Sequence, residues 1–167
     1  MSLSYCAIDF ETANWFRGSP CAVGLVKVVD GAVVDARRYL MRPPKGYDEF
    51  DEFNISLHGI TPEMVRHEPR FAQRLPEILA FADGLPFVAH NAAFDIGVIR
   101  DACDVSDLVW PRLSYACTLV LSRVTWASCP TRFRGSPRQP GYRSTDVPIG
   151  QFERRWERSP PPERSRL

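Results

Sequence analysis

The chain has 167 residues, of which 44% are hydrophobic and 25% are charged, and its formal net charge is +1. These totals are typical of a globular domain. No apolar run approaches the ~18 residues that cross a bilayer, and no signal peptide opens the chain, so we expect a cytoplasmic protein with no membrane partner. The five cysteines are scattered and form no C-x-x-C pair, which argues against a disulfide framework or a zinc site.

Charge and proline content divide the chain in two. Residues 1–126 hold 12 Lys and Arg against 16 Asp and Glu, whereas residues 127–167 hold 9 Arg, no Lys, 4 acids and 7 of the 15 prolines. A segment of that composition buries little apolar surface and does not easily offset its ordering entropy. We therefore predict a folded domain at residues 1–126 and an Arg/Pro-rich irregular tail at residues 127–167.

The first elements are expected to form an antiparallel meander of three strands. Apolar runs predict these strands at residues 3–9, 22–29 and 32–41. Asp30-Gly31, between the second strand and the third, is a strong hairpin turn signal.

The rest of the domain is expected to alternate helices and strands. Residues 42–57 are predicted to be irregular, and Thr61 followed by Pro62 indicates the start of a short helix. The later elements are a helix at 71–81, a strand at 85–89, a helix at 91–103 and a helix within 115–126 that begins near Thr118. A meander followed by such an alternation is a mixed α/β layered domain.

Asp9 and Glu11 stand at the end of the first predicted strand. Residues i and i+2 of a strand point to the same face, so both carboxylates aim at one point. Paired carboxylates suit Mg²⁺ or Mn²⁺, which prefer oxygen ligands. The alternative interpretation is a pair of solvated surface acids.

A further acid, Asp95, falls in the first turn of the helix predicted at residues 91–103. Asn91 is expected to cap that helix, and Asp95 could face the first pair of acids across the end of the sheet. The alternative is an aspartate that is stabilised only by the helix dipole.

Three stretches in order resemble the motifs of the DnaQ-like 3′–5′ exonucleases, in the His-type branch of the DEDD superfamily. They are A-I-D-F-E-T at 7–12, S-L-H-G-I-T-P-E at 56–63 and H-N-A-A-F-D at 90–95, followed by Y-A-C-T-L-V-L at 115–121. The resemblance spans about residues 3–126 and is nearest to bacterial relatives of the DNA polymerase III epsilon subunit.

The resemblance implies a ribonuclease H-like α/β fold, a mixed sheet with an antiparallel three-strand meander flanked by helices. It also implies a 3′–5′ exonuclease that hydrolyses phosphodiester bonds with two divalent ions, Mg²⁺ or Mn²⁺. Asp9, Glu11 and Asp95 would be both the catalytic residues and the metal ligands. The residues implied near the 3′-terminal nucleotide are Phe10, Thr12, His58, Ile60 and Asn91. An ordinary loop histidine is an equal interpretation of His58.

The implied partners are the 3′ end of single-stranded nucleic acid, with DNA ahead of RNA, and a DNA polymerase subunit. One alternative is a non-catalytic nucleic-acid-binding or polymerase-associated module, in which the Arg-rich tail would contact phosphates through charge. Another is an RNA exonuclease of the same fold, which would depend on contacts with the 2′-hydroxyl.

The last motif of the family, H-x-x-x-x-D or Y-x-x-x-D, supplies a fourth carboxylate and the group that orients or deprotonates the attacking water. No histidine follows His90 in this chain. Tyr142 and Asp146 fit the second form as a string, but Gly141 and Pro148 disfavour a helix there. Losing one member of a catalytic unit commonly costs orders of magnitude in rate, so an impaired site is expected.

We hypothesise that the reading frame changes near residues 126–127, where the match to the family stops and Arg, Pro, Ser and Gly become frequent. Another frame of the coding DNA after Trp126 is then expected to encode an H-x-x-x-x-D helix. Translating that DNA in all frames tests this expectation. A truncated or diverged domain is left if no frame restores the motif.

Overall fold

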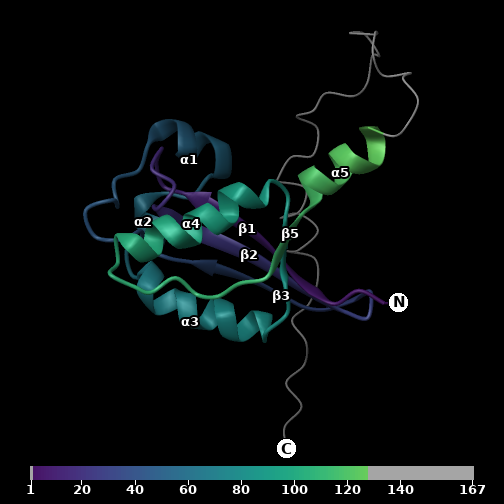
Figure 1. Cartoon of the computed structure of the whole chain (residues 1–167). Coiled ribbons are helices and arrows are strands. Elements are labelled where there is room, and N and C mark those ends of the chain that lie inside the picture. Colours follow the sequence, from purple (N-terminus) through teal and green to yellow (C-terminus); the bar gives the residue numbers. More distant parts are fainter. Residues whose placement is uncertain (1, 128–167) are drawn as a thin grey trace, which may run out of the picture. The chain divides into compact units, whose positions relative to one another are not determined.

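A five-stranded mixed sheet organises residues 2–127, the part of the chain that the computed structural model describes. The strand order is β3-β2-β1-β4-β5 (Figure 1). Neighbouring strands pair antiparallel from β1 to β3, and β4 pairs parallel with both β1 and β5. The strand bounds are β1 (Tyr5–Thr12), β2 (Pro20–Val29), β3 (Ala32–Leu40), β4 (Phe87–Ala89) and β5 (Tyr115–Cys117).

This topology confirms the predicted mixed sheet with its three-strand antiparallel meander. The hairpin between β2 and β3 turns at Asp30 and Gly31, whose φ values are 52° and 80°. Two successive positive φ values are what a tight hairpin turn of type I′ requires, and Asp-Gly supplies them at low cost.

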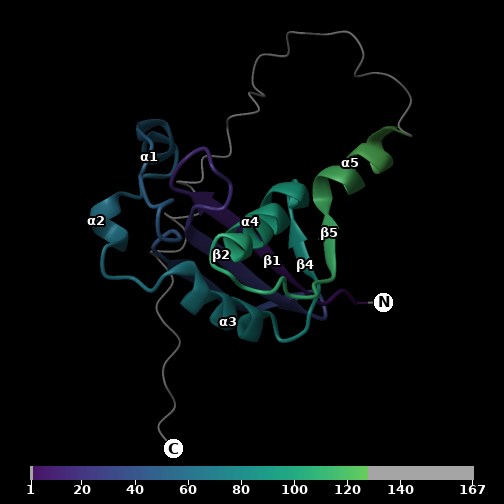
Figure 2. The same ribbon diagram turned by 60° about the vertical axis from the view of Figure 1, so that its left-hand side comes forward.

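Two helices cover one face of the sheet, α3 (Phe71–Ala82) and α4 (Ala92–Asp104), as predicted (Figure 2). Alternate side chains of β1, Cys6, Ile8 and Phe10, are buried in the same apolar cluster as the inner stripes of both helices. Because strand side chains alternate between faces, Asp9 and Glu11 belong to the opposite face of the sheet.

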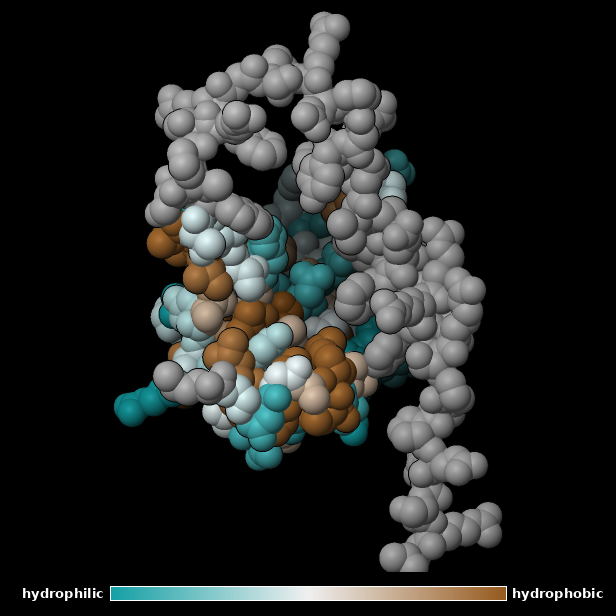
Figure 3. Space-filling view, turned by 90° about the vertical axis from the view of Figure 1, so that its right-hand side faces the viewer, coloured by the Kyte–Doolittle hydropathy of each residue, from teal (hydrophilic) through white to brown (hydrophobic). Residues whose placement is uncertain are grey.

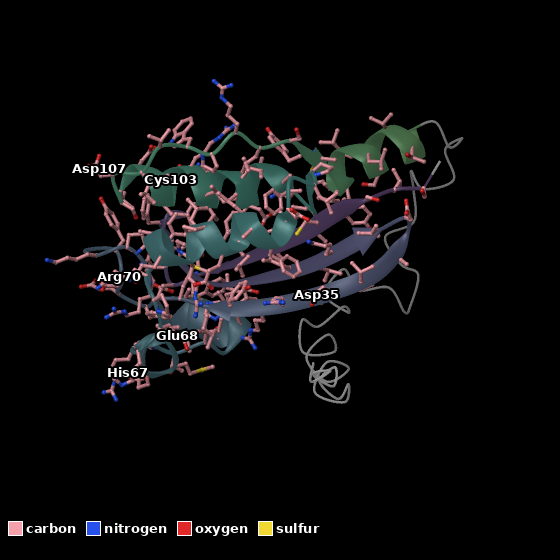
Figure 4. The ribbon with its side chains drawn as sticks, turned by 90° about the horizontal axis from the view of Figure 1, so that it is seen from below. Asp35, His67, Glu68, Arg70, Cys103 and Asp107 are labelled. Carbon is pink, nitrogen blue, oxygen red and sulfur yellow. The ribbon has the colours of Figure 1, made fainter. Side chains whose placement is uncertain are left out.

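The prediction of irregular structure at residues 42–57 is wrong at its end, where α1 (Glu52–His58) forms. The Asp51 carboxylate accepts the N–H of Phe53 at 2.9 Å, so Asp51 is the N-cap of this helix. Asp48, three residues earlier, forms an ion pair with Arg70 at 3.0 Å. Figure 4 shows Arg70 on the same edge of the molecule as Glu68 and His67.

The short helix α2 (Pro62–Val65) begins at Pro62 as predicted, although the Thr61 side chain makes no capping hydrogen bond. The helix predicted to begin near Thr118 is confirmed as α5 (Thr118–Ala127), and the three residues before it form β5, which was not predicted. The tertiary context decides the formation of β5, because residues 115–117 pair with β4 residue by residue.

Helix α5 leaves large apolar side chains in solvent, namely Val120, Leu121 and Val124. Hydrophobic residues are also visible on the face that Figure 3 presents. The predicted domain boundary at residues 126–127 coincides with the limit of the described residues and stays a prediction. Within residues 2–127 no helix is long and apolar enough to span a bilayer.

We predict that Ile99→Ala destabilises the domain by about 2–5 kcal/mol, because Ile99 is fully buried between α4 and the sheet. The matched control is Leu121→Ala on α5, where the side chain is 65% exposed and the expected change is within about 0.5 kcal/mol. Urea denaturation followed by circular dichroism measures both. Equal losses in the two variants would contradict this assignment of the core.

Candidate active site

Strand β1 presents Asp9 and Glu11 on the face of the sheet opposite to α3 and α4. Along the strand, buried Ile8 and Phe10 alternate with exposed Asp9 and half-buried Glu11, which confirms that the two acids share a face. The acids lie inside the strand and not beyond its end, because β1 continues to Thr12 through its pairing with β2.

Asp95 reaches β1 from the start of α4. Strand β4 pairs with β1 at Cys6 and Ala7 and ends at Ala89, and the chain then turns into the helix. One turn later, Oδ1 of Asp95 accepts the backbone N–H of Phe10 at 3.0 Å. The side chain of Asp95 is only 1% exposed. Asp95 of the H-N-A-A-F-D stretch is therefore hydrogen-bonded to the backbone of Phe10, the residue between Asp9 and Glu11.

Asn91 occupies the N-cap position of α4, as predicted. The Asn91 side chain makes no cap hydrogen bond, and its backbone is left-handed with φ of 66°. Its carbonyl oxygen instead accepts the N–H of Phe94 at 2.7 Å. The sharp turn from β4 into α4 requires positive φ, which Asn tolerates better than most residues.

Burial and mutual repulsion disfavour the ionised forms of these acids. Burial raises the pKa of Asp95, the N–H of Phe10 lowers it, and the nearby charge of Asp9 raises it, so that the resulting pKa is about 6. Desolvation also raises the pKa of Asp9, and the charge of His90 lowers it. Two coupled, desolvated carboxylates would be stabilised by a cation placed between them.

The acids fit a divalent ion by their chemistry, since all three are hard oxygen ligands. Within residues 2–127, however, no three His, Cys, Asp or Glu side chains are grouped closely enough to hold a metal ion. The hydrogen bond to Phe10 holds one oxygen of Asp95 against the backbone. Tyr142 and Asp146 lie outside the described residues.

Three of the residues predicted to lie near the nucleotide, Phe10, Thr12 and Ile60, are buried inside the fold. The side chains of Phe10 and Ile60 are buried in the two apolar clusters. Thr12 is also buried, and its carbonyl oxygen accepts Nδ2–H of Asn54 at 2.9 Å. A direct contact of these residues with a nucleotide stays a prediction.

Both ring nitrogens of His58 are engaged within the protein. Nδ1 accepts the N–H of Ile60 at 3.0 Å, and Nε2 lies 3.1 Å from the carbonyl oxygen of Thr12, to which it can donate. Burial lowers the pKa of His58, which favours the neutral ring that this pattern requires. His58 therefore connects the end of β1 to the segment after α1 through these two hydrogen bonds. Its predicted contact with a nucleotide stays a prediction.

Arg38 is a neighbour of the site that the sequence analysis did not identify. It stands opposite Gly24 on β3, and Gly24 stands opposite Asp9, so the three residues form one row across the sheet. Burial lowers the pKa of His58, and the positive charge of Arg38 lowers it further. Burial raises the pKa of Cys21, and the charge of Arg38 partly opposes that effect. The Asp30-Gly31 turn alone would place Arg37 opposite Gly24, and the register shift between Lys27 and Val28 brings Arg38 there instead, so no local signal in the sequence identifies it.

His90, the first residue of the H-N-A-A-F-D stretch, is a second neighbour of the site. It follows β4, its Nδ1 lies 3.0 Å from Oγ1 of Thr118, and its charge acts on Asp9. Its place beside Asp9 follows from the parallel pairing of β1 with β4, which a sequence pattern does not specify.

We predict that Asp95→Asn removes a pH dependence from the stability of the metal-free protein. The folded-state pKa of about 6 exceeds the ordinary value of 3.8, so the folded protein keeps a proton that the unfolded chain loses. The unfolding free energy of the wild type should therefore fall as pH rises from about 4 to 6. Relative to the wild type, the variant should be about equally stable at pH 4 and more stable at pH 8, by on the order of 1–3 kcal/mol. Urea denaturation at several pH values checks this, and a pH-independent difference would contradict it.

Comparison with known proteins agrees with this geometry. The family model described as an exonuclease, RNase_T, matches residues 6–135. A DNA polymerase III of the PolC type from Thermotoga petrophila is 32% identical over 123 residues, which are 72% of this chain and 9% of that protein. The 3′–5′ exonuclease DinG of Bacillus subtilis is 27% identical over 128 residues, which are 73% of this chain and 13% of that protein. The chain thus spans 15% or less of the curated relatives that it matches.

Solved structures give the same fold. Exonuclease X, in complex with 5′-overhanging duplex DNA, superposes with a TM-score of 0.57 at 25% identity and covers 84% of this chain and 80% of its own. The nuclease domain of 3′hExo, a DEDDh family member bound to rAMP, has a TM-score of 0.60 at 19% identity, covers 74% of this chain and 69% of its own, and supports the fold alone. Because the family model matches more than half of the sequence, the chain belongs to the exonuclease family.

Proposed function

We propose that this chain is a metal-dependent 3′–5′ exonuclease domain that acts on the 3′ end of single-stranded DNA, as in proofreading or repair. The observation that carries the proposal is the hydrogen bond from the N–H of Phe10 to Asp95. It connects the acid of the H-N-A-A-F-D stretch to the strand of the D-F-E stretch. Family membership and the exonucleases among the relatives support the same activity.

In this proposal Asp9, Glu11 and Asp95 hold Mg²⁺ or Mn²⁺. Bound ions of this kind polarise the phosphodiester and lower the pKa of a water molecule that attacks it. The role of this chain is to supply ionised carboxylates in fixed positions. Asp9 and Glu11 are fixed by the strand, and Asp95 is fixed by the N–H of Phe10.

Asp95 must lose its proton before it can bind a cation. Its pKa of about 6 in the metal-free protein means that it is mostly ionised at neutral pH, and a nearby cation would lower the pKa further. Metal binding is therefore expected to weaken below about pH 6, where protons compete for this carboxylate.

The proposal also includes a protein partner and a preferred nucleic acid. The PolC-type relatives favour an association with a DNA polymerase subunit. DNA is proposed ahead of RNA for the same reason. A cytoplasmic location stays a prediction.

The alternative function is a non-catalytic nucleic-acid-binding or polymerase-associated module. It is favoured by the lack of a group of three metal-binding side chains within residues 2–127, and by the missing H-x-x-x-x-D motif. A module of this kind would bind a 3′ end and leave it uncut.

We predict that Asp9→Ala reduces the Mn²⁺-dependent shortening of single-stranded DNA roughly hundredfold or more, because it removes a carboxylate that no neighbour can replace. A 5′-labelled oligonucleotide incubated with the full chain and resolved on a denaturing gel gives the rate. Replacing Mn²⁺ by EDTA should abolish shortening, and an RNA strand of the same sequence tests the RNA alternative.

The matched control is Asp107→Asn. Asp107, labelled in Figure 4, follows α4 at the end opposite to Asp95, and its φ of 55° is one that Asn also adopts. This variant should shorten DNA at the wild-type rate. Full activity of Asp9→Ala would overturn the proposed site, and binding without shortening by the wild type would favour the module.

A further inference from the structure

A pocket lies between the segment after β3, helix α2 and the start of α3, and its volume is about 290 Å³. Its described lining residues include three arginines, Arg42, Arg66 and Arg70, two acids, Asp48 and Glu63, and several apolar residues. All of them lie within residues 42–70, so the pocket is separate from the acids of the candidate active site. Figure 4 shows Arg70 at the edge of the molecule. We call this site the arginine pocket.

The floor of the arginine pocket is apolar and belongs to the fold. Val65 is only 2% exposed and Pro43 is fully buried. Phe50 is half-buried and packs against the same apolar cluster as Val65. The volume is near the lower limit of the roughly 300–1,000 Å³ that ligand pockets have, so it admits one or two side chains. An apolar side chain placed on this floor would leave water against a surface that is already formed.

Two of the arginines are held side by side by the backbone. Arg42 and Arg70 form a parallel bridge, in which the N–H of Arg42 donates to the carbonyl oxygen of Pro69 at 2.9 Å. Nε–H of Arg42 donates to the carbonyl oxygen of Glu68 at 3.0 Å, and the guanidinium of Arg70 donates to the carbonyl oxygen of Pro43. Because both side chains are positioned before a ligand arrives, binding costs less side-chain entropy.

The pocket has an excess of positive charge. Asp48 is paired with Arg70 at 3.0 Å, whereas Arg42 and Arg66 form no ion pair within residues 2–127. The remaining acid of the lining, Glu63, stands three residues before Arg66. Three guanidinium groups against two carboxylates leave a charge of +1, which a single anionic group would balance. The rim is also accessible, since Asp48, Glu63 and Arg66 are exposed.

We infer that the arginine pocket binds a short peptide segment of a partner protein. One apolar side chain of the segment lies on the floor, and the carboxylate of a neighbouring Asp or Glu side chain binds Arg42 and Arg66. A guanidinium suits this role because its planar N–H groups match the two oxygens of a carboxylate. The inference does not depend on the proposed nuclease activity, because the pocket contains none of the acids that this activity needs.

The same observations disfavour a nucleic-acid backbone as the occupant. A run of phosphodiesters supplies negative charge but no apolar group for the floor formed by Val65, Pro43 and Phe50. The two acids of the rim, Asp48 and Glu63, would also repel a second phosphate. An apolar side chain beside a carboxylate meets both requirements of the pocket.

The test begins with a selection of phage-displayed random dodecapeptides on the immobilised full chain. The enriched sequences should share an apolar residue next to Asp or Glu. The affinity of one enriched peptide, labelled with fluorescein and amidated at its C-terminus, is then measured by anisotropy. Arg66→Ala should weaken binding roughly tenfold or more, because a charge-assisted hydrogen bond is lost. Arg66 is exposed, so this change leaves the fold intact, which circular dichroism verifies.

Arg42→Gln should weaken binding to a similar extent, since Gln can still donate to the carbonyl oxygen of Glu68 but carries no charge. Arg42→Lys should recover part of the loss, because it restores the charge without the planar group. This recovery separates a contact with the ligand from a purely structural role of Arg42.

The matched control is Arg100→Ala, because Arg100 is an exposed arginine of α4 that lies over the ring of Trp110 and not in the pocket. This variant should bind the peptide as the wild type does. Enriched peptides that bind Arg66→Ala and Arg42→Gln with wild-type affinity would overturn the inference, as would a selection that enriches no sequence. Displacement of the peptide by duplex DNA would assign the pocket to phosphodiesters and overturn it as well.

Discussion

The arrangement of the candidate site depends on one interaction, the hydrogen bond between the backbone of Phe10 and the carboxylate of Asp95. It forms where β4 has ended, so an acid from the first turn of α4 takes the place that a strand neighbour would have. The cost is a desolvated carboxylate close to Asp9, which raises the pKa of Asp95 to about 6. The fold thus holds together two negative groups that repel each other, an arrangement that a bound cation would stabilise.

The two faces of the sheet differ in the side chains that they present. The face under α3 and α4 holds the apolar core, to which β1 contributes Ile8 and Phe10. The opposite face presents Asp9 and Glu11, and Gly24 leaves room between Asp9 and Arg38 in the same row. Because side chains alternate along a strand, the backbone that carries the two acids is the same backbone whose other face is packed in the core.

Most of the fold was predictable, because its signals are local. The Asp30-Gly31 turn and the apolar runs around it predicted the meander, and helical periodicity predicted α3 and α4. The errors came where a local pattern is short or where pairing decides. Helix α1 was missed because its seven residues bury none of their side chains, and residues 115–117 became a strand because β4 offers them a partner. Asn91 takes the predicted N-cap position, but its side chain makes no capping hydrogen bond, and its positive φ belongs to the turn between β4 and α4.

The sequence by itself indicated which acids form the candidate site and which family the chain resembles, since D-F-E on a strand and H-N-A-A-F-D before a helix are patterns of neighbours along the chain. Only the tertiary structure decided what surrounds them. Arg38 and His90 approach the acids through strand register, and away from the site Arg42 meets Arg70 through a backbone bridge. Such contacts join residues far apart in the chain, so no local pattern records them, and they exist only once the sheet has paired.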